Sequence, residues 1–406
     1  MSIVATETEV GPAEGAPAAQ SPPRLESVDL VRGGVMVLMI LDHVRDYFSD
    51  KRLSPVDLSE TTASLFLTRW LTHFCAPAFV FLAGTGVCLA ATRGKSRPDL
   101  SRFLWTRGLW LVVLELTVVR FGMTFTLDYR YVPAGVLWVI GWSMVILSGL
   151  IYLPMRVVAA LGVLMIAGHN LFDGIEPGAF GRFGWVWKVL HKQGRIALSP
   201  HATLHVLYPL IPWVGVMAAG YAFGEFLLLN LRRRQQLLFV LGTSLVGGFL
   251  TLRALNLYGD SEPWSYQKGA LFTAFSFLDC KKYPPSLLFL LMTLGPLILA
   301  LAALDRESKA GPLGRSLITL GRVPLFYYLL QWILIHAMAL ILALATGQPA
   351  RWLVASEPFH SPPGAGYGLP MVYLMWGVSV VLLYPACRWF ADLKRRRKDL
   401  AWLSYF

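Results

Sequence analysis

Long apolar runs, repeated from Val28 to the C-terminus, constrain this chain more than any other feature of its sequence. A run of about 18 or more apolar residues is long enough to cross the hydrocarbon core of a bilayer as a helix. Only 15% of the residues are charged, against about 25% in an ordinary soluble domain. The pattern predicts an all-α, polytopic membrane helix bundle embedded in a lipid bilayer.

The hydropathy pattern predicts about ten transmembrane helices, whose ends a sequence places only to within several residues. They cover residues 28–48, 67–92, 103–125, 133–153, 155–172, 204–229, 235–257, 285–304, 317–345 and 371–390. Residues 1–23 are rich in Ala, Pro, Glu and Thr, lack the pattern of a secretory signal, and are expected to be a disordered tail. The membrane domain is expected to span 24–393, and residues 394–406 to form a basic cytoplasmic tail.

Basic residues indicate the orientation, because cytoplasmic loops of membrane proteins are enriched in Lys and Arg. With ten spans, the main basic clusters fall on one side, at residues 93–102, 232–234, 306–315 and 394–398. Both termini are then cytoplasmic, and the longer opposite loops face the periplasm or exterior. Trp185, Trp187 and Trp264 of those loops either shape a site there or form an interfacial aromatic belt.

The net charge of +12 is explained by these helix ends, and no spacing typical of RNA-binding or zinc-finger proteins accompanies it. No nucleic-acid partner is therefore expected. Four cysteines form no CxxC pair and indicate no disulfide framework. Without an HExxH motif, a Cys/His cluster or a P-loop, the sequence predicts neither a metal site nor ATP hydrolysis.

The first predicted helix carries charged groups at both of its ends. A charge inside a membrane span costs several kcal/mol, so it usually faces the bundle interior or water. Asp29 and Arg32 are i, i+3 neighbours that can pair. Arg32 and His43 are eleven residues apart, close to three turns, and so lie on one stripe about 16 Å apart. Gly33 and Gly34 permit close approach of another helix or of a ligand.

At the far end of this stripe, His43 is a candidate general base. Its side chain titrates near neutrality, and a carboxylate can hold its tautomer. By spacing, Asp42 can pair with Arg45 or, alternatively, Asp46 with His43. The alternative is a set of helix-end charges with snorkelling arginines and one hydrogen-bonded histidine.

Further polar groups lie in or beside other predicted spans. Arg69 and His73 share one face of the second helix, and Pro77 interrupts its hydrogen bonding. His73 either faces His43 or bonds a backbone carbonyl for packing. Three more buried charges, expected within spans, each need a partner elsewhere: Glu115, Arg120 and Arg253.

In combination, these residues resemble a known group of membrane enzymes. The pattern Asp29-x-x-Arg32-Gly followed by His43 is similar to the opening helix of the transmembrane acyltransferase superfamily, including its acyltransferase-3 branch. The chain resembles still more closely the bacterial relatives of heparan-α-glucosaminide N-acetyltransferase. That resemblance extends to residues 71–84, 208–215, 282–287 and 321–328.

The resemblance implies a bundle that takes an acyl group, usually acetyl, from acyl-CoA on the cytoplasmic side. The group passes to a hydroxyl or amine of a sugar or glycan on the other side, in a bacterial cytoplasmic (inner) membrane. The implied roles are as follows: Arg32, Asp29 and Arg322 at the donor; His43 as base with Asp42 or Asp46 orienting it; His73, Arg69, Arg45 and His205 at the acceptor. Arg322 has an alternative role as a positive-inside anchor. The oligomeric state is open, with a homodimer among the alternatives.

Two further points remain open at this level. The animal lysosomal enzyme has asparagine at the position of His43 and its catalytic histidine in the following loop, whereas residues 49–64 here contain no histidine. The base is therefore expected to be His43, acting by direct attack or through an acyl-histidine. The rival function is a transporter or flippase, because intramembrane charges and broken helices fit that class as well.

Overall fold

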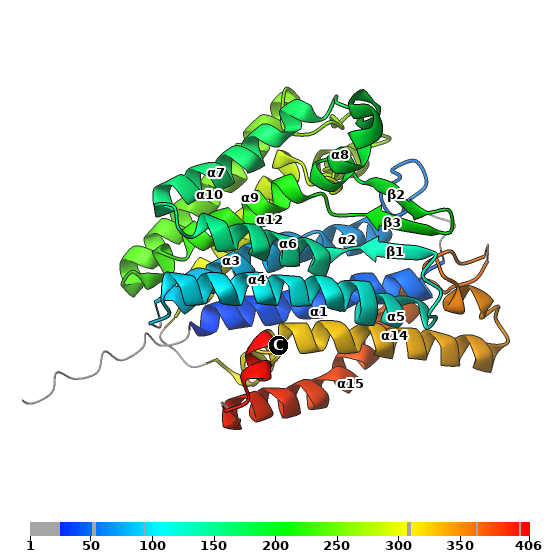
Figure 1. Ribbon diagram of the computed structural model, residues 1–406. Helices are drawn as coiled ribbons and strands as arrows, with labels where there is room; N and C mark the ends of the chain where they lie inside the picture. The colour runs from blue at the N-terminus through cyan, green and yellow to red at the C-terminus, as the bar shows by residue number, and fades with distance from the viewer. Residues whose placement is uncertain (1–24, 51–53, 93, 307–309, 363, 398) are drawn as a thin grey trace, which may run out of the picture.

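The computed structural model describes residues 25–50, 54–92, 94–306, 310–362, 364–397 and 399–406. Most of its helices run side by side in a bundle, with a small sheet at one end (Figure 1). The expected tail 1–23 lies outside the described residues, as do Arg93, Lys309 and Lys398 of the basic clusters.

Fifteen α-helices make up most of the described chain. Their bounds are α1 Glu26–Phe48, α2 Ala63–Thr72, α3 Cys75–Ala91, α4 Arg97–Leu114, α5 Arg120–Thr124, α6 Val136–Leu150, α7 Met155–Gly168, α8 Gly184–Leu190, α9 Leu210–Phe223, α10 Leu231–Leu255, α11 Ala270–Leu278, α12 Leu287–Leu304, α13 Pro312–Gly321, α14 Pro324–Thr346 and α15 Leu369–Arg396. A π-helical turn, η1 (Glu115–Val119), joins α4 to α5, and two short 3-10 helices used below are η2 (His169–Phe172) and η6 (Ala401–Tyr405).

Each of the ten predicted spans contains one helix or consecutive helices, although the fourth and the sixth begin in strands of the sheet described below. Among the described residues, seven helices or helix pairs are long and apolar enough to cross a bilayer. Judged by length and composition, the structure therefore does not confirm the predicted count of ten spans. The predicted spans that fall short are α1 and α4, which carry several charged residues, and α6, which has 15 residues. The protein is therefore a mostly helical membrane protein with at least these seven candidate spans.

A three-stranded sheet corrects the all-α expectation. Its strands are β1 (Tyr131–Ala134), β2 (Gly194–Ser199) and β3 (Ala202–Val206), in the order β1-β3-β2. β3 pairs in parallel with β1 and antiparallel with β2. The predicted sixth span began at Leu204, but the chain there is extended, and helix α9 starts only after Pro209, which is compatible with a helix start but not a helix interior.

Close backbone approaches at glycine explain how the helices pack. A Cβ on Gly108 of α4 would lie 2.5 Å from the Gly141 carbonyl oxygen of α6, and the reverse distance is also 2.5 Å. Between α3 and α9, a Cβ on Gly84 would meet the Met217 carbonyl oxygen, and a Cβ on Gly220 would meet that of Phe81. Small residues at crossings are typical of membrane bundles, because packing rather than the hydrophobic effect holds helices together in lipid.

The isolated buried charges have local partners. Glu115, in the π-helical turn, accepts from the backbone N–H of Leu137 at 3.0 Å, at the N-terminus of α6. Arg120 donates to the carbonyls of Tyr131 and Thr126. Arg253 donates to four carbonyls in and around α11, among them that of Ser276 at 2.9 Å. Each of these three charges therefore finds its partners in a different part of the protein.

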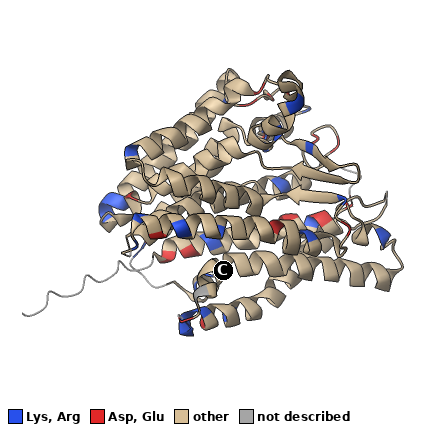
Figure 2. Ribbon diagram, in the orientation of Figure 1, with Lys and Arg blue, Asp and Glu red and all other residues tan. Residues whose placement is uncertain are grey.

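Charge is distributed unevenly along the bundle. Lys and Arg gather at the end where α10 begins and α15 ends, and others lie at the opposite, sheet-bearing end (Figure 2). α1 begins at the same end as α15 ends (Figure 1). This arrangement agrees with the predicted placement of both termini on one side, and the identity of that side stays a prediction.

Candidate functional site

A cavity of about 330 Å³ lies between α1, α3, α4, α6 and α14. Its lining on α3 runs from Phe79 to Ala90, eleven residues or about 16 Å along a helix. The cavity is therefore elongated along the bundle axis. Its walls are mainly apolar, with Met36, Leu82 and Ile140 among them.

Four cationic side chains line the cavity: Arg32, Arg107, Arg322 and Lys394. They come from α1, α4, the α13–α14 junction and α15, and they form what we call the basic mouth. Such a convergence of cations from four elements creates a strong binding potential for an anionic group.

Asp29 holds two of these cations in place. Arg32 Nη1 donates to Asp29 Oδ1 at 3.3 Å and to the Gly321 carbonyl at 3.2 Å. Arg322 Nε lies 3.5 Å from Asp29 Oδ2. The predicted Asp29–Arg32 pair is confirmed, and the three residues named for donor binding lie together; their role stays a prediction.

Helix α13 can reach Asp29 because glycine lies at both sides of its crossing with α1. A Cβ on Gly33 would collide with the Leu317 carbonyl oxygen, and a Cβ on Gly321 with that of Asp29. Gly34 has nothing within 4 Å of its Cβ position. Of the two glycines predicted to allow close approach, Gly33 therefore does so.

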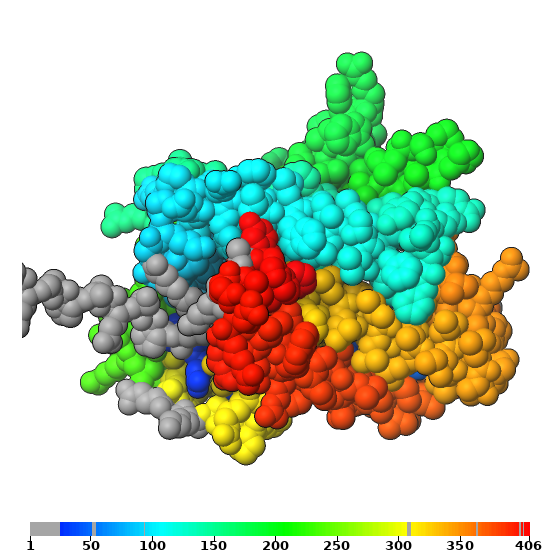
Figure 3. Space-filling view, turned by 60° about the horizontal axis from the view of Figure 1, so that its bottom comes forward, coloured from blue at the N-terminus to red at the C-terminus, as the bar shows by residue number. Residues whose placement is uncertain are grey.

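The C-terminal segment covers part of the basic mouth. Arg107 Nη1 donates to the Ser404 carbonyl at 2.6 Å, and the hydroxyls of Thr106 and Tyr405 lie 3.0 Å apart. Phe406 lines the cavity. Figure 3 shows the red C-terminal part of the chain lying against both cyan residues and yellow-to-orange residues of the bundle. The expected tail 394–406 thus begins as the last turn of α15 and ends packed on α4.

His43 lies beside the inner part of this cavity. Its ring stacks on Trp332 with centroids 4.0 Å apart, and the Tyr328 ring lies edge-on at 6.1 Å. Tyr328 is one of the described residues that line the cavity, whereas His43 is not. His43 is therefore separated from the cavity by neighbours such as Tyr328. Its Nδ1 makes no hydrogen bond of normal geometry to a described residue, and the Gln331 side chain lies next to the ring.

The carboxylates beside His43 bond to arginines. Arg69 Nη1 donates to both oxygens of Asp42, each at 2.6 Å, and Arg45 Nη2 donates to Asp42 Oδ1 at 3.0 Å. Asp46 Oδ1 accepts from Arg45 at 3.2 Å. The Asp42–Arg45 pairing is confirmed. Asp46 pairs with Arg45 and not with His43, which was the alternative that the spacing allowed. The Arg45 guanidinium lies between the two carboxylates and offers both of them charge-assisted bonds.

Around Asp42 the structure gathers several groups from distant segments. His73, at the break between α2 and α3, is 4% exposed, packs against Phe289, and lies near Arg69 and Lys282. Lys282 lies over the Tyr283 ring, 5.3 Å from its centroid. We call this group, with Arg45 and Tyr208, the polar cluster: Asp42, Arg45, Arg69, His73, Tyr208, Lys282 and Tyr283.

His205 lies in the sheet, three residues before Tyr208 of the polar cluster. It lies on β3, where its Nδ1 is 2.6 Å from the Tyr131 hydroxyl. Burial and the nearby Arg195 hold the pKa of His205 below its usual value. The acceptor role that the sequence suggested for His205 stays a prediction.

Several residues of the site were missed by the sequence. Arg107 lies within a predicted span, and the cost of a charge in lipid is a signal that could have marked it. Trp332 and Gln331 meet His43 across almost 290 positions of the chain, which no local pattern reveals. Tyr208 and Lys282 lie in the stretches that carried the family resemblance.

The family model described as "Heparan-alpha-glucosaminide N-acetyltransferase, catalytic" matches residues 24–258. None of the curated proteins matches the chain significantly. The matched range runs from α1 through α10 and includes Arg32, His43, Arg69 and Arg107. Because the match covers more than half of the 406 residues, the chain belongs to the heparan-alpha-glucosaminide N-acetyltransferase catalytic family.

Proposed function

We propose that this protein transfers an acetyl group from acetyl-CoA to a hydroxyl or amine of a sugar or glycan. One observation carries the proposal. A single elongated cavity is lined by four cations at the basic mouth and by Tyr328, which contacts His43. An anionic donor with a long arm fits this combination of charge and shape.

The basic mouth suits the phosphates of CoA. Guanidinium groups donate paired, charge-assisted hydrogen bonds to phosphate oxygens, and a lysine adds a point charge. The apolar walls beyond the mouth would cover the arm that carries the thioester. Arg322 lies at the α13–α14 junction, and Tyr328 lies in the first turns of α14, about 6 Å along the helix from Pro324, so this segment contributes to both ends of the path.

His43 is proposed as the general base. Its imidazole would remove the proton from the acceptor O–H or N–H as that oxygen or nitrogen attacks the thioester carbonyl carbon. The carbon–sulfur bond then breaks, and the CoA thiolate takes up the proton from His43. Gln331 takes the place of the expected carboxylate in orienting the ring, while Asp42 and Asp46 act at a distance through their arginines. An acyl-histidine route uses the same residues.

The polar cluster is proposed as the acceptor side. Arg45, Arg69 and His73 lie there, with Lys282 and Tyr283 supplied by the loop before α12. Hydroxyl-rich ligands are bound by such mixtures of charged and aromatic groups. We place the donor entrance at the cytoplasmic face of a bacterial inner membrane and the acceptor at the opposite face.

The test uses purified full-length protein, labelled acetyl-CoA and glucosamine among a panel of sugar acceptors. His43→Ala should abolish transfer yet keep the rise in melting temperature that acetyl-CoA causes, since ligand at 100 times Kd stabilises by about 2.7 kcal/mol. His360→Ala, at an exposed position, should behave as wild type. Transfer by His43→Ala would refute the base, and no thermal response to any CoA thioester would favour a transporter.

A further inference from the structure

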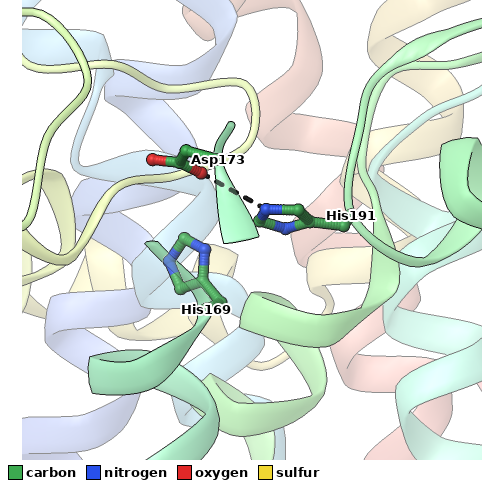
Figure 4. A group of neighbouring side chains, drawn as sticks. All are labelled: His169, Asp173 and His191. Carbon is green, nitrogen blue, oxygen red and sulfur yellow. Dashed lines mark ion pairs between the residues drawn. The ribbon is translucent and has the colours of Figure 1, made fainter. Parts of the chain in front are cut away.

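Two histidines and an aspartate converge outside the cavity described above. His169 lies in η2 directly after α7, Asp173 follows that turn, and His191 follows α8. Figure 4 shows the three side chains directed toward one another from these separate segments. Each offers one ligand atom, and these atoms all lie within 4.8 Å of one another.

Both imidazoles are buried without ordinary partners. His169 is 1% exposed and His191 is 0% exposed. None of their four ring nitrogens makes a hydrogen bond of normal geometry to a described residue, although the Pro285 carbonyl lies near His169. A buried polar atom left unpaired costs about 1–3 kcal/mol, and two such rings in one place require an explanation.

The spacing of the ligand atoms suits a tetrahedral ion. His191 Nε2 lies 3.3 Å from Asp173 Oδ1. In a tetrahedral zinc site with bonds of about 2.0–2.1 Å, neighbouring ligand atoms are about 3.3–3.4 Å apart. The other two edges of the triangle end on His169 and are at most 4.8 Å long, so a rotation of that ring would bring all three ligand atoms to the spacing of a metal site.

A neighbouring amide orients the carboxylate. Asn170 Nδ2 donates to Asp173 Oδ2 at 2.8 Å, which leaves Oδ1 directed toward His191. Outer groups that fix the direction of a ligand in this way are typical of metal sites. The Asn170 Oδ1 atom accepts from the backbone N–H of Leu287 at 2.9 Å, so the same side chain also bonds the start of α12.

We propose that His169, Asp173 and His191 bind a divalent transition-metal ion, with Zn²⁺ the ion that this donor set fits best. Two imidazole nitrogens and one carboxylate oxygen are usual zinc ligands, and a water would fill the fourth position. The sequence predicted no metal because His191 lies 22 residues from His169, directly after another helix and outside any recognised spacing.

The ion would join the end of α7 to the α8 segment next to the start of α12. Lys282 and Tyr283 of the polar cluster lie just before α12. The metal would therefore stabilise the acceptor side of the protein and leave the basic mouth unaffected. This consequence rests on the proposed function, whereas metal binding itself does not.

The alternative is a His–Asp–His cluster held together by a shared proton. The test starts from full-length protein in detergent, stripped with a chelator and dialysed against ZnSO4 or CoCl2. Metal content by mass spectrometry and melting temperature are measured for wild type, His191→Gln and Asp173→Asn. Asp173→Asn keeps the size of the side chain and covers the case in which His191→Gln does not fold. His201→Gln, at an exposed position, is the matched control.

Wild type and His201→Gln should each bind one Zn²⁺ per chain and melt at a higher temperature with it. Both site variants should lose at least ten-fold in zinc affinity, and wild type with Co²⁺ should show the visible absorption of a tetrahedral ion. The proposal is overturned if stripped wild type takes up no more zinc than Asp173→Asn, or if Co²⁺ gives no such absorption. These readouts do not depend on acetyl transfer, so a failure here is distinguishable from a failure of the proposed function.

Discussion

Replacing Gly33 by alanine would place a methyl group where α1 and α13 are in backbone contact. The added carbon would lie about 1.5 Å inside the 3.4 Å at which ordinary contact with the Leu317 carbonyl oxygen begins. Neither backbone can yield without moving a whole helix, so the crossing must open by roughly this distance. Overpacking of this kind costs about 1–3 kcal/mol. It would also separate Arg32 on α1 from the Gly321 carbonyl that it bonds.

Gly34 provides the matched control, since nothing lies within 4 Å of its Cβ position. Gly34→Ala should leave stability unchanged or raise it by up to about 1 kcal/mol, because alanine favours the helix. Thermal unfolding and acetyl-CoA titration of both purified variants would measure the effects. Gly33→Ala should melt lower and bind acetyl-CoA at least ten-fold more weakly. Equal behaviour of the two variants would refute the close α1–α13 crossing.

Three other predictions concern the basic mouth, the polar cluster and a titrating loop. Arg107→Ala should weaken CoA binding by about ten- to hundred-fold, as expected for one lost charge-assisted bond, whereas Arg102→Ala, at an exposed position of α4, should not; equal losses in a binding titration would contradict the cavity assignment. Arg69→Met should destabilise the protein by about 2–3 kcal/mol by leaving Asp42 with one cation, and adding Asp42→Asn should recover part of that loss in a denaturation series. Burial and the nearby Glu262 raise the pKa of Asp279 to about 6, so its ionisation opposes folding above that pH and has no effect below about pH 4. Asp279→Asn should therefore stabilise the protein at pH 7.5 by about 2–3 kcal/mol, with the gain vanishing at low pH in melting curves; a gain independent of pH would refute this.

Much of the helix pattern was predictable because lipid permits few backbone structures. The predicted span 155–172 coincides with α7 and η2 at both ends. Within α1, helical spacing alone gave the Asp29–Arg32 and Asp42–Arg45 pairs. Such pairs depend only on helical spacing, which can be read from the sequence once the helix is predicted.

Two kinds of feature were not predictable in this way. The residues of β3 are apolar enough to resemble the start of a span, and only their pairing with β1 and β2 makes them a strand. Contacts between distant segments, such as Trp332 on His43 or Ser404 on Arg107, follow from tertiary packing. Of the two alternative pairs that the spacing allowed, the structure has Asp42–Arg45, and Arg45 also pairs with Asp46.

The account's central claim is that one cavity joins the basic mouth to the neighbourhood of His43. A cryo-EM structure of the full chain with acetyl-CoA, in the absence of acceptor, tests it most directly. The account predicts phosphate density against Arg32, Arg107 and Arg322, and the acetyl group beside Tyr328, where an acceptor could lie within hydrogen-bond reach of the imidazole. Phosphates bound elsewhere, or a thioester outside the cavity and out of reach of His43, would contradict it.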